Sequence, residues 1–458
     1  MRKSTDRPNI ILINCDDLGY GDLGCYGSDR NRTPALDRMA AEGTRFTDFY
    51  MPAPVCSPSR GALMTGCYPR RIGFDSFEGD WVLFPGHPVG LSDQEVTVAE
   101  LLKEQGYATK IVGKWHCGDQ PEFLPTRHGF DSYYGVPYSN DMGRQRGGGE
   151  DGPPLPLLRD EGVIQEQPDQ AGLTERYVEE CVEFIRNNQD DPFFLYFAHM
   201  YVHLPLYAPD RFMEQSDNGR YGAAVECVDW SVEVIMHELK RLGLDENTLV
   251  IFTSDNGSRN RDEGGSNAPL RGTKGTTWEG GMRVPCIMRW PGQIPEGQTC
   301  TELSTAMDIL PTLSELCGAE VPQDRIIDGH DIRPLMGGDA EAESPYDAFY
   351  YYRSEELEAV RVGRWKLHVR KGGEPVEELY DLENDVGETT DVSEDNPSVI
   401  QKLREVADEA RDDLGDGATN AEGSNRRPIG RVEEASPLTE YDEDHPYIVA
   451  MYDLADRG

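Results

Sequence analysis

The chain reads Asn-Ile-Ile-Leu-Ile-Asn-Cys-Asp-Asp at residues 9–17, and this stretch decides the fold. Its apolar run predicts a buried strand, and the strand ends in two adjacent carboxylates, Asp16 and Asp17. Ligands of open α/β sheets bind at the carboxyl ends of the strands. Two neighbouring carboxylates repel each other unless a cation lies between them. The pair is therefore either a turn with two solvated acids or part of a cation site.

A second predicted strand, residues 249–253, ends in the same way. It runs into Ser254, Asp255, Asn256 and Gly257, which taken alone are typical of a β-turn. Together the two strand ends supply oxygen ligands, which Ca²⁺ and Mg²⁺ prefer and zinc does not. The two ends considered jointly favour a metal site. Its predicted ligands are Asp16, Asp17, Asp255 and Asn256.

Strand and helix signals alternate along the first two-thirds of the chain. This alternation predicts an α/β fold, with a mainly parallel mixed sheet flanked by helices. Further strands are predicted at residues 109–112 and 193–197, and helices at residues 97–105, 174–188 and 222–242. Two polar, glycine-rich stretches, residues 144–170 and 257–275, are predicted to be long surface loops, which are usually functional or mobile.

The pattern of residue types changes near Gly337. Short aromatic and β-branched runs between Tyr346 and Tyr380 predict an antiparallel sheet, and a helix with Asn396 as its N-cap follows. We therefore expect an α/β domain at residues 1–336 and a smaller α+β subdomain at 337–415. An acidic, loosely ordered tail is expected at 416–458.

The charge of the chain is extreme, with 84 acidic residues against 44 basic ones and a formal net charge of −40. This argues against binding to nucleic acid and to anionic membrane surfaces, because both need a basic face. Two explanations stay open, an ordinary acidic protein and a halophilic one. In ~1 M salt the Debye length falls to ~3 Å, which screens self-repulsion. We favour the salt-adapted explanation because the excess acid is spread along the whole chain.

Targeting signals are weak. The first apolar run, Ile10 to Ile13, is too short for a signal peptide, and no stretch approaches the ~20 apolar residues of a membrane span. The ten cysteines show no metal-binding spacing, which suits a reducing compartment. A cytoplasmic location is the resulting expectation.

Cys56-Ser57-Pro58-Ser59-Arg60 precedes a run compatible with a helix. Cys56 would lie near the helix N-terminus, where a negative or nucleophilic group is stabilised, and Arg60 could reach back from the next turn. A buried cysteine beside a helix start is the plainer alternative. The motif, however, resembles the C-x-P-S-R signature of the sulfatase family, in which a formylglycine-generating enzyme oxidises the cysteine to formylglycine.

Other segments resemble that family in the same order, and the resemblance covers the chain to about residue 395. They are residues 9–27, the Gly-Lys-Trp-His motif at 113–116, and residues 137–141, 274–284 and 378–382. The resemblance implies an alkaline-phosphatase-like fold and an arylsulfatase-like hydrolase that cleaves sulfate monoesters. It also implies a Ca²⁺ cofactor, with Mg²⁺ as the alternative, and Cys56 as a further metal ligand.

The resemblance also implies roles for single residues. One hydroxyl of the hydrated formylglycine would attack sulfur, and the second would expel sulfate. Arg60, Lys114 and Lys274 would supply fixed positive charge. His203 would protonate the leaving group, and His116 would assist release as a base. Ser139, with Lys114, His203 and Lys274, would bind substrate. His203 is preferred to the nearby His199 through the family pattern.

Alternatives stay open. A phosphodiester or phosphonate monoester hydrolase of the same superfamily would share the metal, the sheet and the modified cysteine. If Cys56 stays a thiol, the site could belong to a non-catalytic protein that binds anions. Among sulfate esters, the sequence does not distinguish a small-molecule substrate from a carbohydrate, and the oligomeric state is open.

Overall fold

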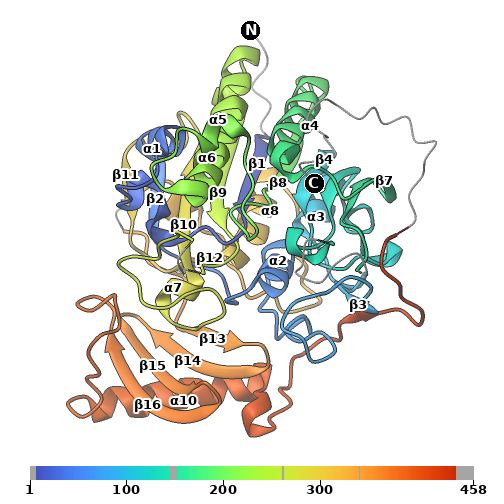
Figure 1. Cartoon of the computed structure of the whole chain (residues 1–458). Coiled ribbons are helices and arrows are strands. Elements are labelled where there is room, and N and C mark those ends of the chain that lie inside the picture. The colour runs from blue at the N-terminus through green and yellow to red at the C-terminus, as the bar shows by residue number, and fades with distance from the viewer. Residues whose placement is uncertain (1–6, 145–151, 260–262, 340, 440–458) are drawn as a thin grey trace.

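The computed structural model of the chain describes residues 7–144, 152–259, 263–339 and 341–439. A large mixed sheet flanked by helices forms its centre, and a separate antiparallel sheet lies at its C-terminal end (Figure 1). The large sheet has the strand order β11-β2-β10-β9-β1-β8-β4-β5-β6-β7, and β12 also pairs with β2. Its strands are β1 (Asn9–Cys15), β2 (Thr44–Tyr50), β4 (Ala108–Lys114), β5 (Ser132–Val136), β6 (Pro156–Arg159), β7 (Gly162–Glu166), β8 (Phe193–Ala198), β9 (Thr248–Ser254), β10 (Arg283–Arg289), β11 (Gln298–Cys300) and β12 (Ser304–Thr305).

The first predicted strand, β1, is central in this sheet. It pairs in parallel with β8 on one side and with β9 on the other, and Asn14 lies opposite Thr253. Because the two strands run side by side in one direction, their carboxyl ends meet at the same edge. The predicted mainly parallel sheet is confirmed, with antiparallel pairs at β10 and at the β6–β7 edge.

Helices cover both faces of the sheet. Ile10 and Leu12 pack in a core with α2, α3 and α8, while Ile11 and Ile13 pack in a second core with α1, α4 and α6. This double burial explains why β1 is continuously apolar. None of the helices in the described ranges is long and apolar enough to cross a membrane. The helices of this domain are α1 (Pro34–Ala41), α2 (Cys56–Thr65), α3 (Val98–Glu104), α4 (Leu173–Asn187), α5 (Asp210–Met213), α6 (Gly219–Leu242), α7 (Glu279–Met282), α8 (Ile309–Cys317) and α9 (Arg333–Met336).

One predicted loop is wrong in part. Residues 144–170 contain the hairpin of β6 and β7, joined through a turn in which Asp160 has a φ of 55°. The two strands have four and five residues, and the apolar runs in them are too short to stand out from the surrounding polar sequence. Residues 145–151 lie outside the described residues. In the second predicted loop, residues 257–275, the described part carries no helix or strand.

The C-terminal subdomain has the predicted antiparallel sheet and helix. Its elements are β13 (Phe349–Arg353), β14 (Glu356–Val362), β15 (Trp365–Lys371), β16 (Glu374–Asp381) and α10 (Pro397–Leu414). The strands pair in chain order, and α10 packs on β14 and β15. Asn396 precedes α10 as expected, but its side chain donates to the carbonyl of Val392 instead of capping the helix.

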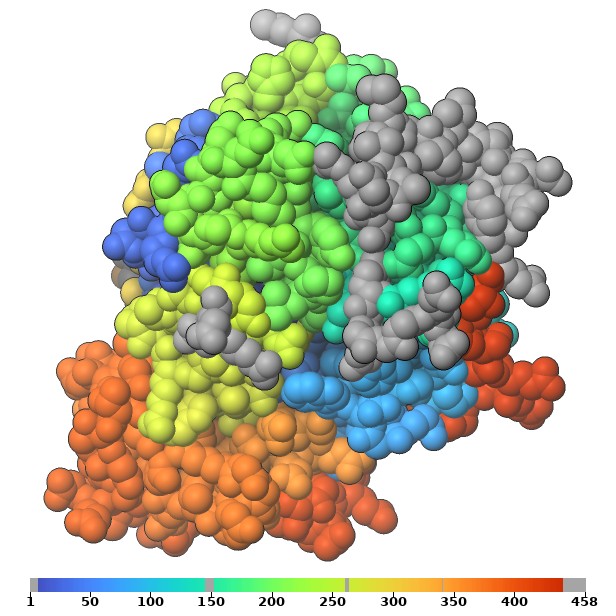
Figure 2. All heavy atoms as spheres, in the orientation of Figure 1, coloured from blue at the N-terminus to red at the C-terminus, as the bar shows by residue number. Residues whose placement is uncertain are grey.

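The expected loose order from residue 416 onward does not hold for residues 416–439. The strand β17 (Gly430–Arg431) pairs with β3 (Val89–Gly90), and Arg427 forms an ion pair with Glu95. In Figure 2 this segment, drawn in red, lies along the blue and cyan region of the catalytic domain. The rest of the predicted tail, residues 440–458, lies outside the described residues. The tail sequence alone did not indicate these contacts because their partners lie more than 300 residues away.

Buried charges join the small sheet to the large domain. Lys366 on β15 lies 3.0 Å from Glu279 and 2.9 Å from Glu388, and none of the three side chains is exposed. Its ammonium also donates to the carbonyl of Thr277 at 2.8 Å. Glu279 begins α7, five residues after Lys274. The small sheet therefore holds the segment that follows this predicted active-site lysine.

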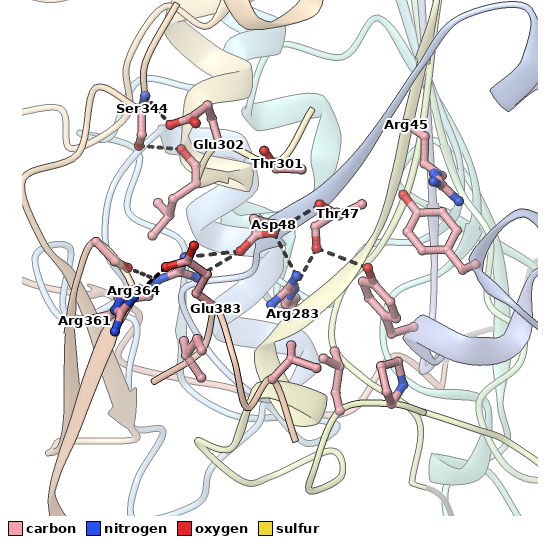
Figure 3. Close-up of a pocket in the computed structure, with 18 of the residues that line it drawn as sticks. Arg45, Thr47, Asp48, Arg283, Thr301, Glu302, Ser344, Arg361, Arg364 and Glu383 are labelled. Atoms are coloured by element: carbon pink, nitrogen blue, oxygen red, sulfur yellow. Dashed lines mark hydrogen bonds and ion pairs between the residues drawn. The ribbon is translucent and has the colours of Figure 1, made fainter. Parts of the chain in front are cut away.

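A cavity of about 1030 Å³ lies between the two sheets (Figure 3). Four arginines line its walls, and three of them form ion pairs, while Arg45 donates to the carbonyl of Cys25 and to Thr299 Oγ1. Arg283 and Arg361 both contact Asp48, at 2.7 and 3.2 Å. Arg364 contacts Glu383 at 2.8 Å. The cavity wall is therefore close to balanced in charge.

Candidate active site

The two predicted strand ends meet at one edge of the sheet. Asp16 and Asp17 follow β1, Asp255 and Asn256 follow β9, and all four side chains are buried. The backbone N–H of Asp17 donates to Asp255 Oδ1 at 3.2 Å, and Asn256 Nδ2 donates to Asp17 Oδ1 at 2.8 Å. The structure thus brings the four predicted metal ligands together at one edge of the sheet.

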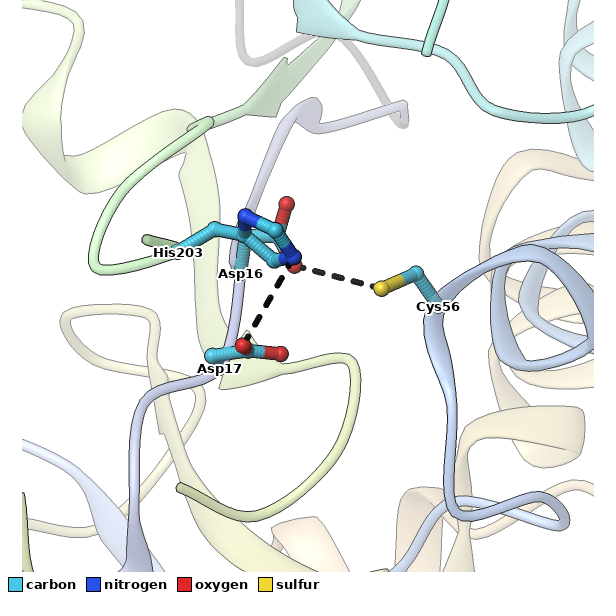
Figure 4. A group of neighbouring side chains, drawn as sticks. All are labelled: Asp16, Asp17, Cys56 and His203. Atoms are coloured by element: carbon cyan, nitrogen blue, oxygen red, sulfur yellow. Dashed lines mark hydrogen bonds and ion pairs between the residues drawn. The ribbon is translucent and has the colours of Figure 1, made fainter. Parts of the chain in front are cut away.

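Cys56 lies opposite this edge as the first residue of α2. Its thiol is 3.5 Å from Asp16 Oδ1. Ligand atoms of Asp16, Asp17, Cys56 and His203 all lie within 4.8 Å of one another. In Figure 4 Cys56 and His203 approach the adjacent Asp16 and Asp17 from two other segments of the chain. Such a cluster of buried acids around a sulfur and an imidazole is a candidate metal centre.

Each carboxylate of the cluster has its own cation. Lys114 Nζ lies 2.5 Å from Asp16 Oδ2, and Lys274 Nζ lies 2.6 Å from Asp17 Oδ1. These contacts place the two predicted lysines at the sulfur-facing side of the cluster. Lys114 also donates to Ser139 Oγ at 2.8 Å, which places that predicted substrate-binding serine within the same network.

Arg60 reaches back from the second turn of α2, as expected. Its Nε donates to Asp255 Oδ2 at 2.9 Å, and Nη1 donates to the carbonyl of Lys114 at 2.8 Å. The guanidinium is buried, so its charge acts at low dielectric on the neighbouring carboxylates. It thereby ties the end of β9 to the end of β4.

Burial and neighbouring charges shift the pKa values of these groups. Burial would raise the pKa of Asp16, but Lys114, His203 and Arg60 outweigh it and hold that pKa well below its usual range. Burial, with Asp16 next, raises the pKa of Asp255 to about 7. Burial, again with Asp16 next, raises the pKa of the Cys56 thiol to about 12. An unmodified Cys56 would thus stay a neutral thiol at neutral pH, which is a poor nucleophile.

The hydrogen bonds of His203 assign its tautomer. Nδ1 faces Asn140 Oδ1 at 3.0 Å and the carbonyl of Leu204 at 2.6 Å, so we assign the proton to Nδ1. Nε2 then points its lone pair toward Asp17 Oδ2, 3.8 Å away. Burial, followed by Lys274, lowers the pKa of His203. The ring can thus hold a second proton on Nε2 only weakly and can pass it on readily.

His116 has the opposite arrangement. Its Nε2 donates to the carbonyl of Leu83 at 3.0 Å, and its buried Nδ1 has no hydrogen-bond partner in the described structure. Burial, followed by Lys114, holds the pKa of His116 well below its usual range. The ring is therefore neutral, with a free lone pair on Nδ1 that can accept a proton.

A cavity of about 140 Å³ opens beside Cys56. Four other predicted residues line it, namely His116, Ser139, His203 and Lys274, together with residues that the sequence did not indicate: Val55, Trp81, Val82, Phe84, Asp141, Met142, Arg259 and Thr273. His199 does not line this cavity, and its Nδ1 accepts from the backbone N–H of Tyr201. The geometry thus separates the two nearby histidines, which their spacing in the sequence could not do.

The sequence pointed unequally to the site residues that were not predicted. Asn140 and Asp141 lie inside the quoted segment 137–141, and Arg259 lies in the predicted functional loop 257–275. Trp81 belongs to an irregular stretch with no periodic pattern, so nothing in the sequence indicated it.

Two buried oxygens of the site accept no hydrogen bond in the described structure, Asp17 Oδ2 and Asn256 Oδ1. Buried oxygens without a donor are costly, and a cation would satisfy them. With Asp16 and Asp255 nearby, the donor set consists of carboxylate and amide oxygens, the ligands of a hard divalent cation. The residues at this edge therefore fit such an ion.

Comparisons with known proteins give the family of the chain. A family model described as sulfatase matches residues 8–319, and one described as N-sulphoglucosamine sulphohydrolase, C-terminal, matches residues 273–413. Human arylsulfatase A is 40% identical over 447 residues, which cover 87% of each chain. Canine N-acetylgalactosamine-6-sulfatase is 44% identical over 384 residues, 79% of this chain and 71% of the relative.

A solved structure, the PsFucS1 sulfatase from Pseudoalteromonas sp., superposes with a TM-score of 0.81 at 28% identity. The superposition covers 93% of this chain and 92% of that one. The alkaline-phosphatase-like fold expected from the sequence is thus confirmed. The family model spans well over half of the chain, and arylsulfatase A is covered to 87% at 40% identity, so the chain belongs to the sulfatase family of enzymes.

Proposed function

We propose that this sulfatase cleaves sulfate monoesters with a formylglycine made from Cys56 and a bound divalent cation, Ca²⁺ or, alternatively, Mg²⁺. The observation that carries the proposal is the position of Cys56. Its sulfur lies at a helix start between Asp16 Oδ1 and the ammonium of Lys274, in a cavity open to a ligand. The raised pKa of its thiol supports a need for chemical modification before position 56 can act as a nucleophile.

The cation would be held by Asp16, Asp17, Asp255, Asn256 and the modified side chain at position 56. When bound, it supplies positive charge to the sulfate oxygens and to the nucleophile. The two acceptor oxygens without donors, on Asp17 and Asn256, support this placement. The hydrated aldehyde supplies an attacking hydroxyl and a second hydroxyl that permits release of sulfate.

The fixed cations of the chain would neutralise the substrate. A sulfate monoester is anionic, so positive charge preorganised around the sulfate lowers the barrier to attack. Lys274 lies 3.1 Å from the sulfur of Cys56 and is best placed for this. Lys114, fixed by Asp16 and Ser139, and Arg60, fixed by Asp255, would orient the sulfate oxygens and the ligand carboxylates.

The two histidines would move protons in opposite directions. His203 would deliver a proton from Nε2 to the leaving oxygen, since its Nδ1 is occupied by Asn140 and Leu204. His116 would take a proton through the free lone pair on Nδ1. The lowered pKa of each ring keeps His116 in the accepting form and makes protonated His203 a strong donor.

The proposed partners follow from the chemistry. The substrate is a sulfate ester of a carbohydrate or a small molecule, and the names of N-acetylgalactosamine-6-sulfatase and arylsulfatase A point to these two classes. A formylglycine-generating enzyme would act on Cys56 within Cys56-Ser57-Pro58-Ser59-Arg60 before the chain folds, because the folded helix α2 buries this segment.

The test has two parts. Mass spectrometry of the peptide with position 56, from natively expressed protein, should show an aldehyde in place of the thiol. The same protein with Ca²⁺ should hydrolyse an aryl sulfate far faster than a matched aryl phosphodiester or phosphonate monoester. Active protein with an intact thiol would overturn the proposed nucleophile. Faster turnover of the phosphorus esters would assign the enzyme to the other branch of the superfamily.

A further inference from the structure

An aromatic side chain stands at the cavity beside Cys56. Trp81 lines this cavity and is 44% exposed, which is unusual among the large hydrophobic side chains that the structure describes. The indole ring lies against the active-site loop, since a Cβ on Gly275 would come within 3.0 Å of it. An exposed aromatic face beside a reactive group is suited to stacking on a ring of a ligand.

The segment that carries Trp81 is fixed to the active site. Ser57 Oγ accepts from the backbone N–H of Leu83 at 3.1 Å, and the Leu83 carbonyl accepts from His116. These two hydrogen bonds tie the segment to the residue after Cys56 and to the proposed base. The position of the indole relative to position 56 is therefore held from both sides.

Arg259 supplies an unpaired charge to the same cavity. It is half-buried, and its guanidinium has no hydrogen-bond or ion-pair partner among the described residues. The other cations of the site, Arg60, Lys114 and Lys274, each contact an aspartate. Unlike these three cations, Arg259 contacts no acid among the described residues, so its charge is available to a ligand. Its planar fork matches the oxygens of a sulfate or a carboxylate.

Two acidic side chains lie near Arg259 without forming an ion pair with it. Asp141 lines the same cavity, and its buried Oδ1 accepts no hydrogen bond from the described residues. Glu263 lines a small hollow on the other side of Arg259, beside Asp17. The cavity therefore presents an aromatic face, the partly exposed carboxylate of Asp141, and a guanidinium that has no partner among the described residues. Hydroxyl groups of a sugar could donate to Asp141, while an anionic substituent could meet Arg259.

Among the described residues, every arginine of the larger cavity between the two sheets has a hydrogen-bond or ion-pair partner. The arginines Arg283, Arg361 and Arg364 on its wall are paired with acids (Figure 3). The remaining arginine of that wall, Arg45, already donates to the carbonyl of Cys25 and to Thr299 Oγ1. The unpaired arginine thus distinguishes the smaller cavity, which contains the proposed nucleophile.

We propose that Arg259 forms a second anion subsite next to the scissile sulfate. The preferred substrate is then a sulfated sugar that carries a further anionic group, either a second sulfate or the carboxylate of a neighbouring uronate. The ring stacks on Trp81, its hydroxyls donate to Asp141, and the second anion binds Arg259. This inference rests on the proposed function, because it assumes that the sulfate beside position 56 is the one that is cleaved.

The test compares three substrates on the Ca²⁺-loaded full chain: N-acetylgalactosamine 6-sulfate, its 4,6-disulfate, and the 6-sulfate linked to glucuronate. We expect kcat/KM to be at least about tenfold higher for one of the two dianionic sugars than for the monosulfate. The substitution Arg259→Gln should bring that ratio to about one, while Arg259→Lys should retain part of it. Lys402→Gln, an exposed position on α10, removes the same charge and should leave the ratio unchanged.

The two dianionic sugars distinguish a second sulfate from a carboxylate as the recognised group. A native enzyme that prefers the monosulfate, or an Arg259→Gln variant that keeps the native ratio, would overturn the second subsite. An aryl sulfate without a second anion serves as the separate check on the proposed function. If it is cleaved while the sugars show no preference, sulfate ester hydrolysis stands and the second subsite falls.

A binding measurement makes the inference independent of turnover. Calorimetry of the disulfated sugar on Cys56→Ala protein should give a Kd at least about tenfold lower than on the Cys56→Ala, Arg259→Gln double variant. Equal affinity in the two proteins would overturn the role of Arg259, whatever the state of residue 56.

Discussion

The ammonium of Lys274 lies 3.1 Å from the sulfur of Cys56, although the two residues are 218 positions apart. Burial would lower the pKa of Lys274, but Asp17, the Cys56 thiol and Asp16 outweigh it and raise that pKa. The ammonium is therefore charged at neutral pH. Any group that replaces the sulfur at position 56 would meet this fixed charge, which links the proposed nucleophile to Asp17, a proposed metal ligand.

Replacing Cys56 by Ala should abolish turnover without unfolding the protein. The variant cannot be converted to an aldehyde, so hydrolysis of an aryl sulfate should fall by at least about a thousandfold. The removed sulfur is small, and α2 keeps its other contacts, so the thermal midpoint should change by only a few degrees. Cys227→Ala, at a buried cysteine packed near Ala223, is the matched control and should stay active. Loss of activity in both variants would show that burial, and not chemistry, explains the first result.

Substitutions at Asp17 and at Lys274 should affect metal binding and catalysis differently. Asp17→Asn removes a charged ligand, and we expect the Ca²⁺ affinity measured by calorimetry to fall by at least about tenfold. Lys274→Met removes the ammonium that competes for Asp17 Oδ1, so Ca²⁺ affinity should be unchanged or higher. Turnover in Lys274→Met should nevertheless fall by about a hundredfold or more, because the charge at position 56 is lost. Native Ca²⁺ affinity in Asp17→Asn would remove Asp17 from the ligand set.

The cluster of acidic side chains at the edge of the large sheet was predictable because it follows from strand geometry. Asp16 and Asp255 each end a strongly apolar strand, and carboxyl ends of parallel neighbours meet whatever the loops do. The β6–β7 hairpin was not predictable, because its strands are too short to show a period. Trp81 and Arg259 were missed for another reason. They lie on irregular segments, and their positions depend on tertiary hydrogen bonds such as that of Ser57 to Leu83.

Buried ion pairs between distant residues are a second kind of feature that the sequence does not predict. Glu279 and Lys366 are 87 residues apart and lie in separate predicted units, and each alone resembles an ordinary surface residue. Burial turns them into a contact that joins the two sheets. No local signal pointed to it, because β15 alternates apolar with basic residues and Lys366 stands where a solvent-facing side chain is expected.

Replacing Lys366 by Met should destabilise the protein strongly. The substitution keeps the length of the side chain but leaves the carboxylates of Glu279 and Glu388 buried without their shared cation. Breaking a buried ion pair on one side typically costs about 3–5 kcal/mol. Urea unfolding at neutral pH would measure this loss. Lys402→Met, on the exposed face of α10, should change the free energy of unfolding by less than about 0.5 kcal/mol. Similar losses in the two variants would contradict a special role for the buried lysine.

The pH dependence of stability should carry a contribution from Asp308, which precedes α8. Its carboxyl group accepts hydrogen bonds from the backbone of Thr305 at 2.7 Å and of His330 at 2.8 Å, and from the hydroxyl of Tyr346. Burial nevertheless raises its pKa to about 7. In the unfolded chain an aspartate has a pKa of about 3.9. Between these two values the folded protein holds a proton that the unfolded chain has released.

This difference fixes the sign of the effect. The contribution of Asp308 to stability is fully present below about pH 4 and is lost as the pH rises toward about 7, with a slope of about 1.4 kcal/mol per pH unit. In Asp308→Asn the group cannot titrate. The difference in unfolding free energy between native protein and variant, measured in urea at fixed ionic strength, should therefore shift against the native protein from pH 4.5 to pH 7.5. A difference that stays constant over this range would mean that the three hydrogen bonds keep Asp308 ionised in spite of its burial.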